Sequence, residues 1–211
     1  MRIFVGIKID KGLEEKIGGV QKEFGGFSQS SEIKFVEPGN FHLTLKFLGE
    51  IEEGRSRDST GSWPLPASSL RDLLPPAHNS VKEISERVKS ACWKFKSFRI
   101  SLDGLSFFNP PKSLRVIFLN IVKGKEMIIE IGKELNNLLR DFREEDFKPH
   151  PHLTIARVGF TEEKDKIIEK IKSIDKIHVG EMDVKEIILF ESALSSRGPI
   201  YTELERFPLL A

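Results

Sequence analysis

Residues 42–49 read His-Leu-Thr-Leu-Lys-Phe-Leu-Gly, and residues 152–159 read His-Leu-Thr-Ile-Ala-Arg-Val-Gly. Four of the eight positions are identical between the two copies. Successive side chains of an extended strand point to opposite faces. The histidine and threonine of each copy therefore share one face, and the aliphatic residues share the other. Each copy is predicted to be a strand that anchors itself in a core and presents an imidazole and a hydroxyl on its other side.

The repetition extends beyond this motif. Residues 2–9 are similar to residues 115–122, and each segment is followed by a helical pattern rich in Lys and Glu. The two motifs are 110 residues apart and the two preceding strands 113. Because these spacings agree, we expect an internal duplication of a strand–helix–strand–helix unit. The two lobes would face each other across a central cleft, with one His-Leu-Thr strand from each lobe.

The spacing of apolar residues predicts the elements of both halves. Helices are expected over 12–24, 81–97, 125–140 and 161–174, the last with Thr161 as its N-cap. Strands are expected over 2–9, 34–36, 41–48, 98–102, 114–121, 152–158, 184–191 and 200–206, the last two joined by a polar turn at 195–199.

One segment, residues 54–79, interrupts this pattern. It contains Ser, Arg, Pro and Trp without a regular period, and it includes His78. Structureless loops of this length are uncommon inside a compact domain. We interpret the segment as an irregular surface insertion, disordered or loosely packed, rather than a functional lid, and we assign His78 no catalytic role. The whole chain, residues 1–211, is expected to form one bilobal domain with intertwined lobes.

Composition restricts the class of protein. Hydrophobic residues make up 39% of the 211 residues and charged residues 31%, and the net charge is +1. A soluble globular protein is therefore expected, and its net charge argues neither for nor against nucleic acid. No apolar run approaches the ~20 residues of a membrane span, so no membrane partner is expected. The single cysteine, Cys92, excludes an intramolecular disulfide and favours a cytoplasmic location.

Two imidazoles that face each other form an acid/base pair suited to in-line attack at phosphorus. Hydrolysis of a ribose 2′,3′-cyclic phosphate needs a base for water and an acid for the departing ribose oxygen. A pKa near 6.5 lets one histidine be neutral and the other charged. The hydroxyls of Thr44 and Thr154 can donate to non-bridging phosphate oxygens. This chemistry needs no metal, and no Gly-x-x-x-x-Gly-Lys loop is present, so we expect no cofactor.

Two basic residues within the motifs leave alternatives open. Lys46 has the same strand parity as His42, so it is either a substrate-binding residue at the cleft or a solvated strand lysine. Arg157 lies five positions after His152, and strict alternation turns it away from that histidine. A bulge in the strand could turn Arg157 back toward the cleft.

Four other histidine or aromatic positions are interpreted as structural. His150 lies between two prolines and is expected to shape the start of the second motif strand, and His178 lies on a different strand. A zinc site built by His150, His152 and His178 is the alternative. For Tyr201 and Phe108, packing in the core is favoured over stacking on a base.

Residues 41–50 and 148–157 resemble the paired motifs of the two-histidine phosphoesterase superfamily. The residues that flank the motifs, together with 188–194 and 198–204, are similar to its RNA 2′,3′-cyclic phosphodiesterase branch, also called 2′-5′ RNA ligase. The resemblance implies an α/β (α+β) bilobal fold, with two antiparallel sheets lining a cleft and helices outside. It also implies hydrolysis of terminal 2′,3′-cyclic phosphates to 2′-phosphates, and reversible, ATP-independent joining of such ends to a 5′-hydroxyl.

The resemblance also implies individual roles. By position, His42 would donate a proton to the leaving 3′ oxygen, and His152 would accept one from water or a 5′-hydroxyl. The residues alone leave these two roles open, because the motifs look equivalent. Arg157 would contact phosphate or RNA. The expected partners are RNA with 2′,3′-cyclic phosphate or 5′-hydroxyl ends, tRNA fragments among them, and the chain is expected to be a monomer.

Two rival functions remain open at this point. The same cleft could hold a nucleotide or an RNA end without turning it over, with both imidazoles serving only as hydrogen-bond donors. Alternatively, the chain could be a phosphodiesterase of small cyclic nucleotides or 2′-5′ oligoadenylates. Activity that depends on both imidazoles excludes the first rival, and the dependence of rate on substrate length separates the second.

Overall fold

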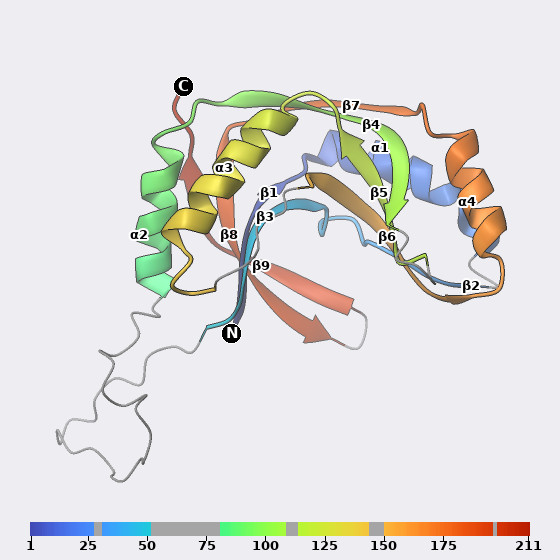
Figure 1. Ribbon diagram of the computed structural model, residues 1–211, viewed down its shortest axis with the longest axis horizontal. Helices are drawn as coiled ribbons and strands as arrows, with labels where there is room; N and C mark the ends of the chain where they lie inside the picture. The colour runs from blue at the N-terminus through green and yellow to red at the C-terminus, as the bar shows by residue number, and fades with distance from the viewer. Residues whose placement is uncertain (28–30, 52–80, 109–113, 144–149, 196–197) are drawn as a thin grey trace, which may run out of the picture.

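The computed structural model describes residues 1–27, 31–51, 81–108, 114–143, 150–195 and 198–211. These ranges contain four α-helices and two antiparallel sheets (Figure 1). The four-stranded sheet has the order β3 (His42–Glu50), β1 (Arg2–Lys8), β8 (Glu186–Ser195), β9 (Gly198–Pro208). The five-stranded sheet has the order β2 (Ser31–Phe35), β6 (His152–Thr161), β5 (Val116–Ile121), β4 (Phe98–Phe108), β7 (His178–Val184). The helices are α1 (Lys11–Lys22), α2 (Val81–Cys92), α3 (Lys125–Leu138) and α4 (Lys164–Ser173).

The two sheets repeat one arrangement, in which β3-β1-β8-β9 corresponds to β6-β5-β4-β7 and β2 is an additional strand beside β6. Gly6 of β1 lies opposite Thr44, and Phe118 of β5 lies opposite Thr154. Phe118 is therefore the structural counterpart of Gly6. This correspondence is shifted by one residue from the alignment of residues 2–9 with residues 115–122 that the sequence suggested. The expected fold class, a duplicated α/β fold with two antiparallel sheets, is confirmed.

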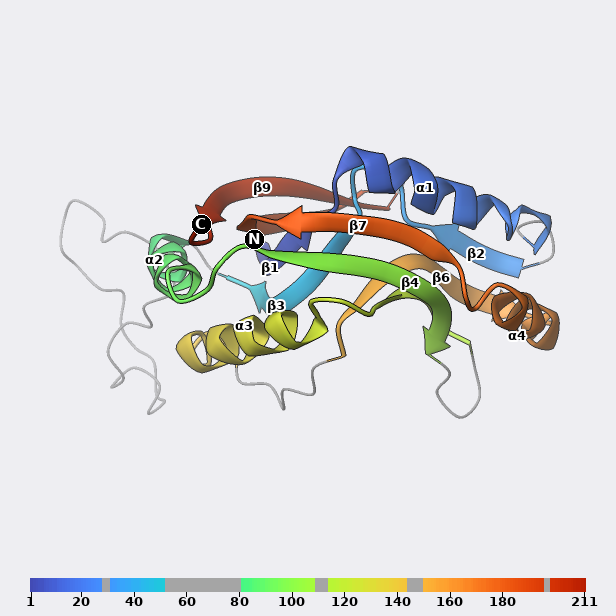
Figure 2. The same cartoon turned by 90° about the horizontal axis from the view of Figure 1, so that it is seen from above.

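Two helices cross from one sheet to the other. Helix α1 follows β1 of the four-stranded sheet but packs against β6 and β7 of the five-stranded sheet. Helix α3 follows β5 of the five-stranded sheet but packs against β3 of the four-stranded sheet (Figure 2). One large cluster of buried apolar side chains, which includes Ile17 of α1 and Ile131 of α3, contains residues of both sheets.

Each helix buries one stripe of apolar residues spaced three or four apart, as an amphipathic helix does. In α1 the buried apolar residues are Leu13, Ile17 and Val20, and in α3 they are Ile128, Ile131 and Leu135. None of the described helices combines the length and the apolar character needed to cross a membrane.

Several boundaries differ from those expected. The apolar run 184–191 is split, because β7 ends at Val184 and β8 begins at Glu186. Helix α2 ends at Cys92, five residues earlier than expected. Helix α4 begins at Lys164, so Thr161 is not its N-cap; the Thr161 Oγ1 instead accepts a hydrogen bond from the Glu163 N–H at 3.0 Å. The expected insertion at 54–79, including His78, lies outside the described residues.

Candidate active site

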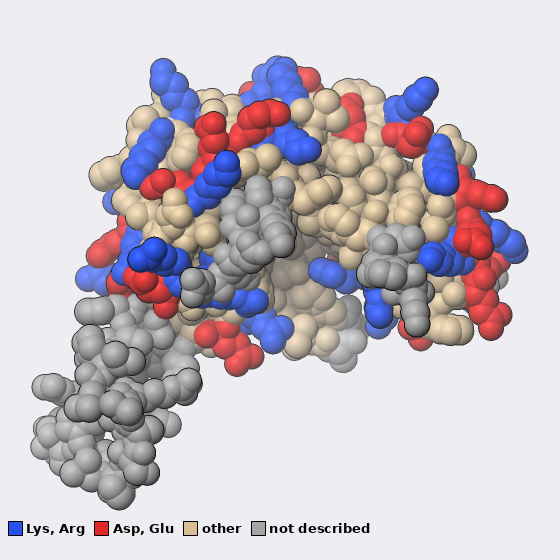
Figure 3. Space-filling view, viewed as in Figure 1, with Lys and Arg blue, Asp and Glu red and all other residues tan. Residues whose placement is uncertain are grey.

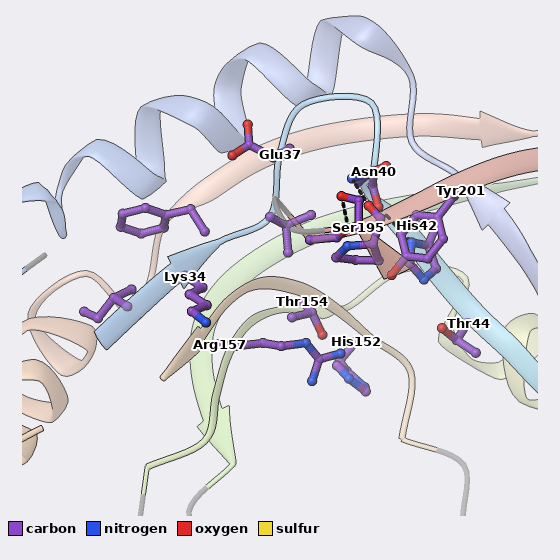
Figure 4. Close-up of a pocket in the computed structure, with 15 residues that line it drawn as sticks. Lys34, Glu37, Asn40, His42, Thr44, His152, Thr154, Arg157, Ser195 and Tyr201 are labelled. Atoms are coloured by element: carbon purple, nitrogen blue, oxygen red, sulfur yellow. Dashed lines mark hydrogen bonds between the residues drawn. The ribbon is translucent and has the colours of Figure 1, made fainter. Parts of the chain in front are cut away.

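A pocket of about 700 Å³ lies where β3 approaches β6. Its walls come from these two strands, from β2 with the loop after it, and from the hairpin formed by β8 and β9 (Figure 4). The lining residues are Ile33, Lys34, Phe35, Val36, Glu37, Asn40, His42, Thr44, His152, Thr154, Arg157, Ser195, Gly198, Pro199 and Tyr201.

The structure brings both His-Leu-Thr motifs into this pocket. His42 and Thr44 project from β3, and His152 and Thr154 project from β6. Leu43 and Leu153, which lie between them in the sequence, are buried on the opposite faces of the two strands. Alternation along each strand therefore separates the polar pair from its apolar anchor, as the sequence predicts.

The two imidazoles are oriented in the same way. The Nδ1 of His42 lies 2.8 Å from the carbonyl oxygen of Asn40, and the Nδ1 of His152 lies 2.6 Å from that of His150. A carbonyl oxygen only accepts, so Nδ1 of each ring carries a hydrogen and donates it. The Nε2 atoms are then left to act at the pocket, where each can accept a proton when the ring is neutral and donate one when it is charged.

Aromatic rings enclose both imidazoles. The ring of His42 lies 4.7 Å from the ring of Phe4 and 4.7 Å, edge to face, from that of Tyr201. The ring of His152 lies 4.9 Å from that of Phe108 and 5.1 Å from that of Phe118. These apolar surroundings remove water from one side of each imidazole and hold its plane.

The same surroundings change the acidity of both rings. Burial lowers the pKa of His42, the hydrogen bond to Asn40 opposes this change, and the charges of Arg157 and His152 add to it. Burial likewise lowers the pKa of His152, against the hydrogen bond to His150, with a further contribution from Arg157. Without a ligand, both imidazoles therefore favour the neutral form near pH 7.

A bulge in β6 places Arg157 in the pocket. Ile117 of β5 lies opposite Ala156, but the next residue, Phe118, lies opposite Thr154, so β6 contains one extra residue at this point. An extra residue reverses the alternation of the side chains that follow it. Arg157 consequently points to the same side as Thr154, next to His152 (Figure 4). Strict parity predicted the opposite orientation.

A matching bulge in β3 removes Lys46 from the pocket. Val5 lies opposite Lys46, whereas the next residue, Gly6, lies opposite Thr44. Lys46 is only 2% exposed, and its Nζ donates to Asn136 Oδ1 at 2.7 Å and to the Arg143 carbonyl oxygen at 3.0 Å. The expectation that Lys46 shares the face of the catalytic motif is therefore wrong. This lysine instead ties the end of α3 and the segment after it to β3.

The two other histidines in the described part of the chain, His150 and His178, have different surroundings. His150 packs against Phe108 and Phe118 beside His152. His178 pairs with Asp103 across β7 and β4, away from the pocket. Among the residues that the structure describes, no three His, Cys, Asp or Glu side chains group as metal ligands would. The donor set required by the zinc alternative is therefore not assembled.

Most of the other lining residues were not found from the sequence, and three of them carry polar groups next to the motif residues. Tyr201, expected in the core, lines the pocket, and burial raises its pKa. Asn40 lines the pocket, and the contact that it makes with His42 is through its backbone carbonyl oxygen, which no residue type in the sequence could indicate. Lys34 lies opposite Arg157 on β2, a pairing between strands that the sequence does not reveal.

Comparison with known proteins identifies the family of the chain. Residues 34–194 match the family model of the 2′-5′ RNA ligase superfamily, and residues 7–60 match that of the LigT-like phosphoesterases. A relative named RNA 2′,3′-cyclic phosphodiesterase, from Methanothermobacter thermautotrophicus, is 30% identical over 99% of both chains. One of the same name, from Archaeoglobus fulgidus, is 30% identical over 98% of this chain and 99% of its own.

Solved structures with low sequence identity share the fold. A Thermus thermophilus protein, TT0787, has a TM-score of 0.71 at 22% identity, covering 99% of this chain and 98% of its own. Escherichia coli LigT in its apo form has a TM-score of 0.67 at 19% identity, covering 100% of this chain and 98% of its own. The family match covers most of the chain and the fold agrees with it. The chain therefore belongs to the 2′-5′ RNA ligase superfamily and is an enzyme, a phosphoesterase.

Proposed function

We propose that this phosphoesterase hydrolyses the terminal 2′,3′-cyclic phosphate of RNA to a 2′-phosphate, with His42 and His152 as its acid and base. The observation that carries this proposal is the pair of imidazoles in one pocket, each with its Nδ1 hydrogen held by a carbonyl oxygen. The activity named for the relatives from two archaea supports the choice of substrate.

In this mechanism the cyclic phosphate lies between the two rings. Neutral His152 accepts a proton from water at Nε2 while the water oxygen forms a bond to phosphorus. The bond from phosphorus to the ribose 3′ oxygen breaks, and protonated His42 donates its Nε2 proton to that oxygen. The product carries a 2′-phosphate and a free 3′-hydroxyl. His42 then takes up a proton and His152 releases one, which restores the starting state.

The neighbouring polar groups stabilise the charge that develops on phosphorus. The hydroxyls of Thr44 and Thr154 donate to the non-bridging oxygens, and the Arg157 guanidinium offsets their negative charge. A bound phosphate also raises the pKa of a nearby imidazole, since an opposite charge favours the protonated form. This effect opposes the burial of His42 and allows that ring to hold its proton when substrate is bound.

The same groups can join RNA ends. If a 5′-hydroxyl takes the place of water, His152 accepts its proton and attack on phosphorus produces a 2′-5′ linkage. The cyclic ester supplies the bond energy, so the step needs no ATP. We expect hydrolysis and ligation to proceed without a bound metal, and therefore to be unchanged in the presence of EDTA.

The proposal is tested with a short oligoribonucleotide that ends in a 2′,3′-cyclic phosphate. The expected product is heavier by one water and co-elutes with a synthetic 2′-phosphate standard. A 3′-phosphate product would contradict the roles given to the two histidines. Binding without turnover would indicate the rival binding module, and equal or faster turnover of mononucleotides would favour the small cyclic nucleotide alternative.

The thiol of Cys92 is buried, and burial raises its pKa to about 12, so the thiol stays protonated and unreactive.

We also expect the protein to act in the cytoplasm as a monomer, with tRNA fragments among its substrates. Sedimentation of the protein at micromolar concentration tests the monomer, since a dimer would have twice the mass.

A further inference from the structure

The pocket is not symmetric about its two histidines. β2 adds a strand beside β6, whereas β3 is the edge strand of its sheet in the described part of the chain. Five consecutive residues, 33–37, from β2 and the loop after it line the pocket. The pocket therefore extends from the histidine pair toward β2, on the side of His152.

Two cations lie in this extension. Lys34 of β2 is directly opposite Arg157 of β6, and directly opposite side chains lie on the same face about 5 Å apart. Figure 4 shows the Lys34 side chain directed toward Arg157, and the carboxylate of Glu37 directed away from both. Neither cation takes part in any of the ion pairs found among the described residues. Like charges that lie directly opposite each other destabilise a sheet, and an anion held between these two side chains would offset that repulsion.

The pairing of Lys34 with Arg157 contrasts with the charges on the outside of the molecule. On the face drawn in Figure 3, Lys and Arg are mixed with Asp and Glu over the outside of the molecule. In the other lobe, the position equivalent to Arg157 is occupied by Phe47, which follows the bulge in β3. The Arg143 guanidinium lies over the Phe47 ring, and Arg143 is not among the residues that line the pocket. The cations of the pocket are thus gathered on one side of the histidine pair.

We propose that Lys34 binds the phosphodiester group that joins the terminal nucleotide to the one before it. This inference rests on the proposed function. Arg157 lies beside His152 and so serves the reacting phosphate, whereas Lys34 lies one strand farther out, about 4.8 Å away. A flexible lysine ammonium is suited to a phosphodiester, which presents charge without a fixed bidentate geometry. Lys34 is therefore a specificity-determining residue, which favours RNA ends over mononucleotides.

Two substrates separate this role from a general effect of charge. The first is a nucleoside 2′,3′-cyclic phosphate, which lacks the second phosphate, and the second is a dinucleotide with the same terminal cyclic phosphate. Lys34→Met is expected to lower kcat/KM for the dinucleotide about tenfold, the effect of one charge-assisted hydrogen bond, and to change the mononucleotide less than about twofold. Lys34→Arg should retain most of the activity. Lys133→Met, at an exposed position of α3, is the matched control and should change neither.

Salt dependence gives a second measurement. The slope of log kcat/KM against log salt concentration for the dinucleotide should become shallower by roughly 0.7 in Lys34→Met, because one phosphate contact is lost from a single strand. An equal loss for both substrates, or no loss for either, would overturn the proposal. If the wild-type protein hydrolyses neither substrate, the proposed function fails by itself. Calorimetry with the dinucleotide then decides the role of Lys34, since a tenfold weaker Kd in Lys34→Met upholds the contact and an unchanged Kd refutes it.

Discussion

At the level of single residues, proton transfer depends on which ring nitrogen of each histidine carries a hydrogen. Carbonyl oxygens of Asn40 and His150 fix this choice for both rings, because they accept a hydrogen bond and cannot donate one. Both carbonyls belong to the residue two positions before the histidine. The local backbone therefore prepares both imidazoles for proton transfer without help from another side chain.

The lowered pKa values of both imidazoles predict an acidic pH optimum. The rising limb of kcat/KM reports loss of the proton from the base, and the falling limb reports loss of the proton from the acid. Because the pKa values of His42 and His152 in the free enzyme both lie below 6.5, the maximum should lie below pH 6.5 and the rate should fall toward pH 8. A flat profile between pH 5 and 8 would show that the histidines do not titrate in the mechanism.

Arg157 should affect both the rate and the position of this profile. Arg157→Met is expected to lower kcat/KM roughly 10- to 100-fold, the effect of losing one or two charge-assisted hydrogen bonds. In the wild type, the charge of Arg157 lowers the pKa of both imidazoles, so its removal should raise both pKa values and move the pH profile to higher pH. Arg157→Lys keeps the charge and should leave the profile in place. A rate loss without any movement of the profile in Arg157→Met would contradict the position given to this guanidinium.

At the scale of strands and helices, alternation predicted the placement of four motif residues and failed for two. His42, Thr44, His152 and Thr154 lie before the bulges, and each lines the pocket as parity requires. Lys46 and Arg157 lie after the bulges, so each points to the face opposite to that predicted. A bulge depends on pairing with the neighbouring strand, so the sequence of a short apolar segment does not predict it. The cation contributed by β2 was missed for the same reason.

Lys46 should stabilise the fold rather than bind substrate. Lys46→Ala leaves the Asn136 Oδ1 and the Arg143 carbonyl oxygen without this donor, and it is expected to lower the free energy of unfolding by about 2–4 kcal/mol. Urea denaturation measures this loss, and exposed Lys133→Met should stay within about 0.5 kcal/mol of the wild type. Where the Lys46→Ala protein is folded, its kcat/KM should be unchanged. A specific loss of kcat/KM without destabilisation would restore Lys46 as a substrate-binding residue.

At the scale of the whole molecule, the exchange of helices joins the two lobes. The sequence predicted the duplication, because both the motif and the strand before it recur at nearly equal spacing. It did not predict that α1 and α3 each cover the sheet of the other lobe, since periodicity shows that a helix has an apolar face but not which sheet that face contacts. Each motif strand, β3 or β6, therefore packs against a helix that follows a strand of the other sheet.

This exchange predicts that the lobes unfold together. Ile17→Ala in α1 and Ile131→Ala in α3 each create a cavity in the shared core and should lower the free energy of unfolding by about 2–4 kcal/mol. In both variants, denaturation followed by circular dichroism and by tryptophan fluorescence should give one coincident transition. Two separate transitions, with each substitution moving only one, would mean that the lobes are independent units.

The two-histidine mechanism is tested first by hydrolysis of an RNA 2′,3′-cyclic phosphate end, in EDTA, by the wild-type protein and by His42→Ala and His152→Ala. Circular dichroism of each variant confirms that it is folded. We expect a 2′-phosphate product from the wild type and a loss of at least about a hundredfold in kcat/KM in each variant, since each proton transfer contributes roughly 10²–10⁴-fold. Near wild-type activity in either variant would contradict the two-histidine mechanism.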